Sequence, residues 1–156
     1  HFDRGEATRL QGVQSIMADV GKAIRLRLLN DTAVTDLIGT RLYPRRIPQG
    51  VENPCAKYQM ISSMREGALD GGSGIVNAMI QIDIFSDSHI EAETISEKMR
   101  ERLQGFRGTE SSVEILGCTL INSRELLSAA VDASDDHDYR VILEFEIQHQ
   151  ETIPTF

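Results

Sequence analysis

The chain has 156 residues and a formal net charge of −8, with 40% hydrophobic and 26% charged residues. This length suits one domain with a substantial core, and no apolar run approaches the roughly 20 residues of a transmembrane helix. The acidic balance argues against sequence-independent binding of duplex DNA, because that mode requires Lys and Arg to neutralise phosphates. We therefore expect a soluble protein, made in a cytoplasm and without a membrane partner.

The first sixteen residues show no sustained hydrophobic period, whereas Met17 opens MADVGKAIRLRLLND, which reads as a natural protein start. We interpret residues 1–16 as a tag or non-native leader, either vector-derived or from an alternative upstream start. Residues 17–156 are predicted to form a single domain.

Two helices are predicted next. Apolar residues recur at four-residue spacing through residues 20–28, which is typical of an amphipathic helix. The stretch NDTAVTDLIG then predicts a second, short helix, capped by Asp31 or Thr32 and ended by Gly39.

A proline-rich segment follows, LYPRRIPQGVENPCAKYQM, which contains three of the four prolines of the chain. A long irregular connection inside a compact domain is usually functional or disordered. We expect residues 42–55 to be a ligand loop, a lid or an arm that reaches a neighbouring subunit. The alternative is an ordinary surface loop.

The next two segments predict a hairpin. Residues 56–64 indicate a strand, and NAMIQIDIFSD indicates a clearer one, with Ile80, Ile82 and Ile84 on one face and Gln81 and Asp83 on the other. Between them, the glycines of REGALDGGSGIV predict a flexible tip at residues 65–75, poorly ordered until a partner covers it.

The second half predicts one helix and two strands. Ser88 and Glu91 form a capping-box pattern, and Gly105 suits the helix end. Residues 113–122 and 139–148 predict strands on either side of the acidic loop DASDDHD. The fold class is therefore α+β, an antiparallel four-stranded sheet with helices packed on one face, in the order α-(α)-β-β-α-β-β.

Possible metal and phosphate sites are weakly supported. The acidic loop 132–138 lacks the glycine and distal glutamate of an EF-hand, so a solvated loop is favoured over a weak cation site. His89 precedes Glu91 and Glu93, but helical geometry is expected to send these side chains in different directions. The stretch GGSG at 71–74 lacks the Lys-Ser/Thr end of a phosphate loop.

Catalytic patterns are weak as well. His137 lies between two aspartates, but no Ser or Cys stands in a nucleophile motif. Cys55 and Cys118 are far apart in the sequence without metal-ligand spacing, which predicts two buried thiols. The sequence therefore predicts no enzyme, no cofactor and no metal.

The order of elements and several phrases resemble the tail completion, or tail terminator, proteins of long-tailed bacteriophages and prophages. The phrases are IRLRLLNDTAVTDLIGTRLYP, IPQGVENPCAKYQMIS, VNAMIQIDIFSDSHIEAETISEKMRERL and YRVILEFEIQH. The resemblance spans about residues 20–150. It rests on patterned phrases rather than on a catalytic motif.

This resemblance implies a structural protein of the virion tail or neck, present in the host cytoplasm during assembly. Such proteins form rings, usually hexameric, that end the tail tube at its head-proximal side and join it to the filled capsid. The implied partners are other copies of the chain, the tail tube protein and a head-completion or neck protein. Duplex DNA would pass through the lumen without specific binding, along a wall whose acidic charge repels it.

Two other functions remain open from the residues alone. One is an oligomeric small-molecule-binding or regulatory domain of similar α+β layout. The other is a hydrolase or metal enzyme with a scattered site.

A ring requires each subunit to hold its neighbour through a heterologous interface that closes by rotation. Extended arms and open strand edges suit that contact. We therefore place the interface in segments 42–55 and 65–75. The candidate residues are Tyr43, Arg45, Arg46, Ile47, Gln49, Arg65, Glu66, Leu69 and Asp70.

Overall fold

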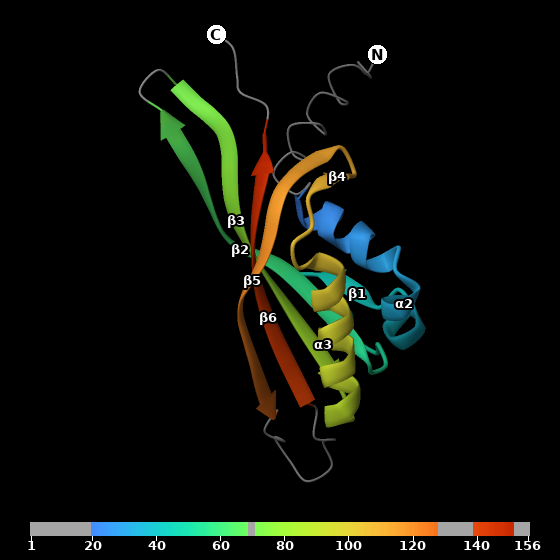
Figure 1. Ribbon diagram of the computed structural model, residues 1–156. Coiled ribbons are helices and arrows are strands. Elements are labelled where there is room, and N and C mark those ends of the chain that lie inside the picture. The colour runs from blue at the N-terminus through green and yellow to red at the C-terminus, as the bar shows by residue number, and fades with distance from the viewer. Residues whose placement is uncertain (1–19, 69–70, 128–138, 152–156) are drawn as a thin grey trace, which may run out of the picture.

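The computed structural model describes residues 20–68, 71–127 and 139–151 of the chain (Figure 1). Residues 20–29 form a helix, followed by α2 (Thr32–Ile38), β1 (Leu42–Pro44), β2 (Cys55–Ala68), β3 (Gly71–Ser86), α3 (His89–Leu103), β4 (Gly108–Glu110), β5 (Val113–Leu127) and β6 (Tyr139–Gln150). The α+β class is as predicted. Within the described ranges, the helices are too short or too polar to cross a membrane.

The six strands form one sheet in the order β1-β2-β3-β6-β5-β4. Every neighbouring pair is antiparallel except β1 and β2, which run parallel. The four long strands are those predicted, but the expected four-stranded and wholly antiparallel sheet is wrong, because β1 and β4 add a short strand at each edge. Three residues are too few to show a hydrophobic period, so the sequence pattern did not reveal them.

The flexible tip predicted at residues 65–75 is mostly strand. β2 continues to Ala68 and β3 begins at Gly71, with Gly67 opposite Gly72. Glycine has no side chain with which to show alternation, yet its backbone still enters the ladder of hydrogen bonds. The predicted long connection is therefore wrong, and the turn itself, residues 69–70, lies outside the described residues.

The short helix and α3 begin where the sequence predicted. Asp31 caps α2 by accepting from the Ala33 N–H (3.1 Å), and the Ser88 hydroxyl caps α3 by accepting from the Glu91 N–H (3.3 Å). A third residue, Ser86, connects the two residues of the capping box. Ser86 Oγ accepts from the Ser88 N–H (3.1 Å) and donates to Glu91 Oε1 (2.7 Å).

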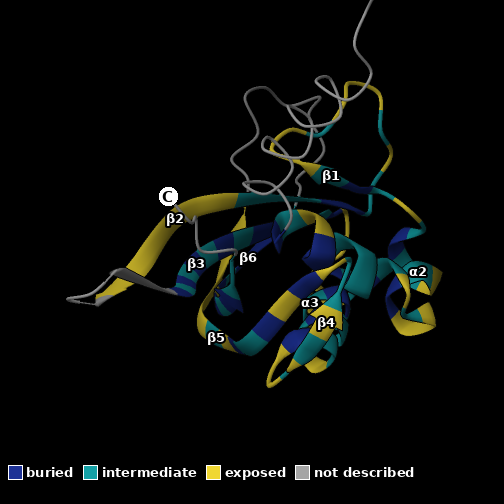
Figure 2. Cartoon of the chain, turned by 90° about the horizontal axis from the view of Figure 1, so that it is seen from above, coloured by how far each residue is buried: buried dark blue, intermediate teal, exposed yellow. Residues whose placement is uncertain are grey.

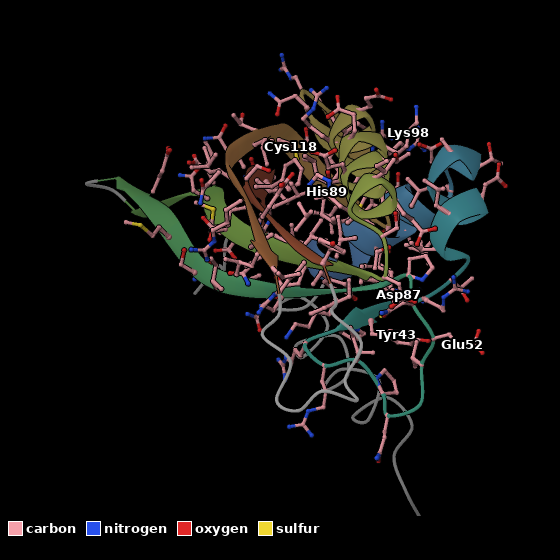
Figure 3. All side chains as sticks on the ribbon, turned by 90° about the horizontal axis from the view of Figure 1, so that it is seen from below. Tyr43, Glu52, Asp87, His89, Lys98 and Cys118 are labelled. Carbon is pink, nitrogen blue, oxygen red and sulfur yellow. The ribbon has the colours of Figure 1, made fainter. Side chains whose placement is uncertain are left out.

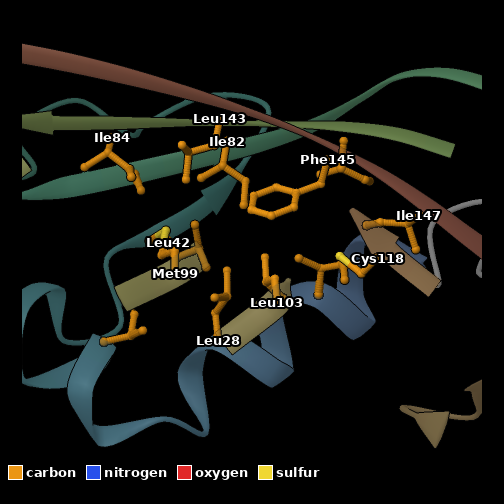
Figure 4. Packing of buried hydrophobic residues seen from close by; sticks show 14 of the residues in the cluster. Leu28, Leu42, Ile82, Ile84, Met99, Leu103, Cys118, Leu143, Phe145 and Ile147 are labelled. Carbon is orange, nitrogen blue, oxygen red and sulfur yellow. The ribbon is translucent and has the colours of Figure 1, made fainter. Parts of the chain in front are cut away.

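The helices in the described part of the chain cover one face of the sheet and bury the stripes expected from the sequence (Figure 1). Figure 4 shows the centre of this core, where Phe145 lies between the sheet and Leu103. The alternating side chains of the two central strands and the stripe of α3 are all buried: Ile80, Ile82, Ile84, Val141, Leu143, Phe145, Ile147, Ala92, Ile95, Met99 and Leu103.

The first helix and α3 are joined by a reciprocal pair of hydrogen bonds. Arg27 Nε donates to the Arg102 carbonyl (3.2 Å), and Arg102 Nε donates to the Arg27 carbonyl (3.0 Å). The Arg27 guanidinium also lies 3.5 Å from the centre of the Phe106 ring. These contacts keep the helices over the middle of the sheet, so the β2–β3 end projects beyond them (Figures 1 and 2).

Candidate assembly surfaces

Segment 42–55 begins as a strand and then turns away from the sheet. Leu42 is fully buried, Tyr43 is half-buried, and both lie in β1 beside β2. Arg45 then adopts a φ of 65°, in the left-handed region, and its N–H donates to the Tyr58 carbonyl at 2.7 Å. The strand therefore ends at Pro44, where the loop begins.

The two ends of this segment are held by three hydrogen bonds. Arg41 Nε donates to the Pro54 carbonyl (2.8 Å), and the Ala56 N–H donates to the Arg41 carbonyl (2.9 Å). Asn53 Nδ2 donates to Asp87 Oδ1 at 2.9 Å. Figure 3 shows Glu52 on the part of the molecule that lies away from α3. These hydrogen bonds hold both ends of the loop against the rest of the domain.

Most of the described side chains along this loop are exposed. Arg45, Arg46 and Gln49 are exposed, and Ile47 is half-buried. None of the described residues forms an ion pair or hydrogen bond with either arginine side chain. Two adjacent cations with no counter-ion in the described part of the chain are consistent with the predicted interface.

The second predicted segment is arranged differently. Arg65 lies in β2 and is already paired, with Nε 2.7 Å from Glu151 Oε1 and Nη2 3.2 Å from Oε2. Glu66 is exposed, and its Oε1 accepts from Asn77 Nδ2 at 3.3 Å. Leu69 and Asp70 lie outside the described residues. This segment is therefore part of a strand edge rather than a separate arm.

The structure does not bring the two predicted segments together. Segment 42–55 leads into the start of β2, whereas Arg65 and Glu66 lie near its end. Ten residues of strand span about 30 Å. One copy of the chain therefore offers two separate contact regions, at opposite ends of β2.

Sequence reasoning missed a set of exposed apolar side chains on the two long outer strands. Among the described residues, seven large hydrophobic side chains are exposed, and six of them lie on β2 or β5. The six are Met60, Ile61, Met64, Ile121, Leu126 and Leu127. The sequence did contain a signal for these exposed side chains, because MISSM and RELL have apolar residues at both odd and even positions. A strand with one solvated face would have apolar residues at alternate positions only.

The helix-free face of the sheet carries a buried charge. Asp83 was predicted to point away from the isoleucine face, which is confirmed, but it is only 1% exposed. Arg140 forms an ion pair with it, Gln81 Nε2 donates to its Oδ1 (2.8 Å), and Lys57 Nζ lies 4.0 Å from Oδ2. Opposite charges and a hydrogen bond stabilise a carboxylate that burial would otherwise destabilise.

The family model described as Tail completion protein gp17 matches residues 22–150, which is most of the chain. The chain belongs to this tail completion family. The resemblance noted from the sequence is thereby confirmed, and membership makes the chain a structural protein of the bacteriophage tail type.

Among solved structures, the tail completion chain is similar in fold to a chain in the virion of a native gene transfer agent (GTA) particle. The TM-score is 0.60 with 16% sequence identity, over 83% of this chain and 92% of that chain. No curated protein sequence matches. At this identity the likeness concerns the fold alone.

This tail completion chain also has an exposed cluster at the start of α3. His89 Nε2 lies 3.1 Å from Glu125 Oε2 and 3.8 Å from Glu93 Oε1. The expectation that His89 and Glu93 point apart is wrong, because residues four apart share a helix face. The hydrogen bond with Glu125 and the charge of Glu93 raise the pKa of His89. His89, Glu93 and Glu125 therefore form an exposed ion-pair cluster.

Both cysteines of the tail completion chain are buried thiols, as the sequence predicted. Burial raises the pKa of the Cys118 thiol to about 12. The reactive form of cysteine is the thiolate, so Cys118 stays protonated and unreactive at neutral pH. Its place in the hydrophobic core (Figure 4) indicates a packing role.

Proposed function

We propose that this protein forms a ring at the head-proximal end of a phage or prophage tail tube, where it terminates tube polymerisation and joins the tail to the head. The support is membership of the tail completion family over residues 22–150. The ring is made of copies of this chain, in a hexamer. Its other partners are the tail tube protein and a head-completion or neck protein, and its place is the virion, after assembly in the host cytoplasm.

Family membership favours this structural, non-enzymatic function over a small-molecule-binding or regulatory domain. Such a ring requires surfaces that a free subunit leaves uncovered. The loop carrying Arg45 and Arg46 is such a surface, because it is anchored at both ends and its two cations have no counter-ion among the described residues.

The acidic balance suits a lumen through which DNA passes. A net charge of −8 gives a wall that repels phosphate rather than retaining it. The acidic loop 132–138 lies outside the described residues. On α3, Glu97 pairs with Arg100 and Glu101 with Lys98, which reduces the charge of that face. A bore lined mainly by Arg and Lys would contradict this part of the proposal.

The loop is tested by reversing its charge. We expect the double variant Arg45→Glu with Arg46→Glu to fold normally but to lose ring formation or docking on the tube. The measurement is the fraction of tail ends that carry the protein, seen by electron microscopy, together with circular dichroism of the free chain.

The control variant is Lys22→Glu with Arg107→Glu, which changes the net charge by the same amount at two exposed positions elsewhere. We expect this control to assemble like the original protein. Unchanged assembly of the Arg45/Arg46 variant would remove the loop from the interface, and equal loss in both variants would show a general effect of charge.

A further inference from the structure

Both long outer strands of the sheet have open edges. β1 pairs with β2 only from Ala56 to Tyr58, and β4 pairs with β5 only from Val113 to Ile115. Beyond β4, the edge of β5 is covered briefly, since Gln104 Oε1 accepts from the Leu120 N–H at 2.8 Å. Among the described residues, no strand covers 59–68 of β2 or 121–127 of β5.

These two edges are also exposed and apolar. Every residue in 60–67, the yellow end of β2 in Figure 2, and in 121–127 is exposed. The two stretches carry six of the seven exposed large hydrophobic side chains among the described residues. Neither stretch contains proline or lysine. Soluble proteins usually protect a free edge with such residues, because it otherwise pairs with another chain. Long, apolar edges of this kind indicate a partner strand in the assembly.

We propose that β2 of one subunit pairs with β5 of the next, so that the sheet continues from copy to copy around the ring. This inference rests on the proposed ring and specifies the contact between its subunits. The four long strands alternate in direction, so β2 and β5 run antiparallel to each other. Subunits related by rotation about the ring axis therefore meet in an antiparallel pair, which is the commoner kind.

The side chains on the two edges fit in one register. Each edge contains an Arg-Glu dipeptide, Arg65-Glu66 on β2 and Arg124-Glu125 on β5. When antiparallel pairing sets Arg65 opposite Glu125, Glu66 falls opposite Arg124. Two opposite-charge pairs of this kind stabilise neighbouring strands.

The same register brings apolar residues together. Met64 falls opposite Leu126, and these side chains are 71% and 45% exposed in the single chain. Pairing would remove apolar surface from water on both sides of the contact, which favours association.

The register is consistent with the faces of the sheet. Opposite residues in an antiparallel pair point to the same face. Arg65 pairs in register with Val76 and Glu125 with Val141, and both valines are buried on the helix-covered face. The first charge pair therefore lies on that face.

The second charge pair lies on the helix-free face. Glu66 Oε1 accepts from Asn77 Nδ2 (3.3 Å), and Arg124 Nη2 lies 3.7 Å from Glu144 Oε1. Asn77 and Glu144 both point away from the helices, since they alternate with buried residues of β3 and β6. Both members of each proposed pair thus share a face.

The same reasoning disfavours a closed dimer in which β2 pairs with β2. Arg65 and Glu66 point to opposite faces, so a two-fold axis cannot place one opposite the other. It can set Arg65 only opposite a residue of its own face, such as Ser63, Arg65 or Gly67, so no β2–β2 register forms the two opposite-charge pairs. The geometry thus favours the heterologous contact, which closes into a ring.

Disulfide trapping tests the contact directly. Met64→Cys and Leu126→Cys are made in separate chains, which are mixed and assembled on tail tubes that lack this protein. Opposite residues have Cβ atoms about 5 Å apart, close enough for a disulfide. We expect mass spectrometry to find the mixed product that links position 64 of one chain to position 126 of the other, with each variant alone giving little dimer. A main product linking position 64 to position 64 would overturn the proposal in favour of the closed dimer.

Charge reversal tests the register. Arg65→Glu or Glu125→Arg alone should weaken assembly about tenfold, because each turns an attraction into a repulsion. The two changes in one chain should restore it. The matched control is Arg65→Glu with Glu151→Arg, which restores the ion pair within the subunit but not the contact between subunits, and should remain weak. The register would be overturned if the Arg65→Glu, Glu151→Arg control restored assembly. It would also be overturned if Arg65→Glu with Glu125→Arg failed to restore assembly.

Failure of this contact and failure of the proposed function are distinguishable. Protein located at tail ends by electron microscopy, without the mixed disulfide product and without rescue, would overturn the edge contact and leave the function intact. The mixed disulfide product in particles that do not attach to tails would overturn the function and leave the contact intact.

Discussion

The central strands β3 and β6 and the outer strands β2 and β5 are of similar length but fold under different constraints. Each central strand has a partner on both sides and helices over one face, and its sequence alternates accordingly. Each outer strand leaves one edge open along a stretch of its length, 59–68 in β2 and 121–127 in β5, and residues of both parities are exposed there. Alternation of hydrophobic residues therefore marks a strand that buries one face. A strand stabilised mainly by its backbone hydrogen bonds need not have an alternating sequence.

The largest expected difference between centre and edge concerns isoleucine. Ile82 in β3 is 0% exposed and Ile121 in β5 is 52% exposed. We expect Ile82→Ala to lower the free energy of unfolding by about 3–4 kcal/mol, through lost burial and the cavity left behind. Ile121→Ala should lower it by less than about 1 kcal/mol in the free chain. Urea denaturation of the two variants measures both values.

The same two variants separate stability from assembly. Ile121→Ala should weaken the ring while leaving the free chain stable, if the β5 edge is covered in the ring. Equal losses of stability in both variants would show that the edge is already covered in the free chain, and the contrast between centre and edge would not hold.

Two ion pairs extend the comparison to charge. Asp83 in β3 is buried and paired with Arg140, whereas Arg65 in β2 is exposed and paired with Glu151. Asp83→Asn leaves a part-buried arginine without its counter-ion, and we expect the free energy of unfolding to fall by about 2 kcal/mol. Glu151→Gln should cause no measurable loss, because water screens an exposed pair.

Thermal and urea unfolding of these isosteric variants provide the measurement. A stability of Asp83→Asn equal to that of the original chain would mean that the buried charge on the helix-free face contributes nothing. In that case the central strands would be held by their apolar face alone.

Much of the fold was predictable, because the central strands and α3 bury one face each. The isoleucines of β3 and the stripe of α3 were assigned to the correct side. The short strands β1 and β4 were not predictable, since three residues show no period. The glycines of 65–75 led to the prediction of a loop, because glycine weakens a strand. Glycine does not prevent backbone pairing, however, so the strands continue through this region.

The candidate surfaces were only partly predictable. Proline and arginine in residues 42–55 indicated an exposed loop, and the structure presents Arg45 and Arg46 there without a counter-ion in the described part of the chain. The pairing of Arg65 with Glu151 joins residues far apart in the sequence, so no local pattern could reveal it. Open edges depend on which strands lie side by side, and that order was not available from the sequence.

Two histidines give the smallest and most specific contrast between centre and edge. His149 lies in β6 and is buried, and burial lowers its pKa. His89 is exposed beside the β5 edge, and its hydrogen bond with Glu125 raises its pKa. The ordinary value for both is about 6.5. Folding therefore shifts the two side chains in opposite directions.

The stability contributions of these histidines should accordingly have opposite pH dependence. The His89 contribution is complete below its unfolded pKa and is lost as pH rises through the higher folded value. His149 favours unfolding as pH falls through its unfolded pKa toward the lower folded one. Nuclear magnetic resonance titration of the ring Cε1–H signals, assigned with His89→Gln and His149→Gln, should place His89 above and His149 below about 6.5. In Glu125→Gln, the pKa of His89 should fall while that of His149 stays unchanged. A shift of both histidines in that variant would mean that the edge and the centre are electrostatically coupled, which their positions in β6 and beside β5 do not predict.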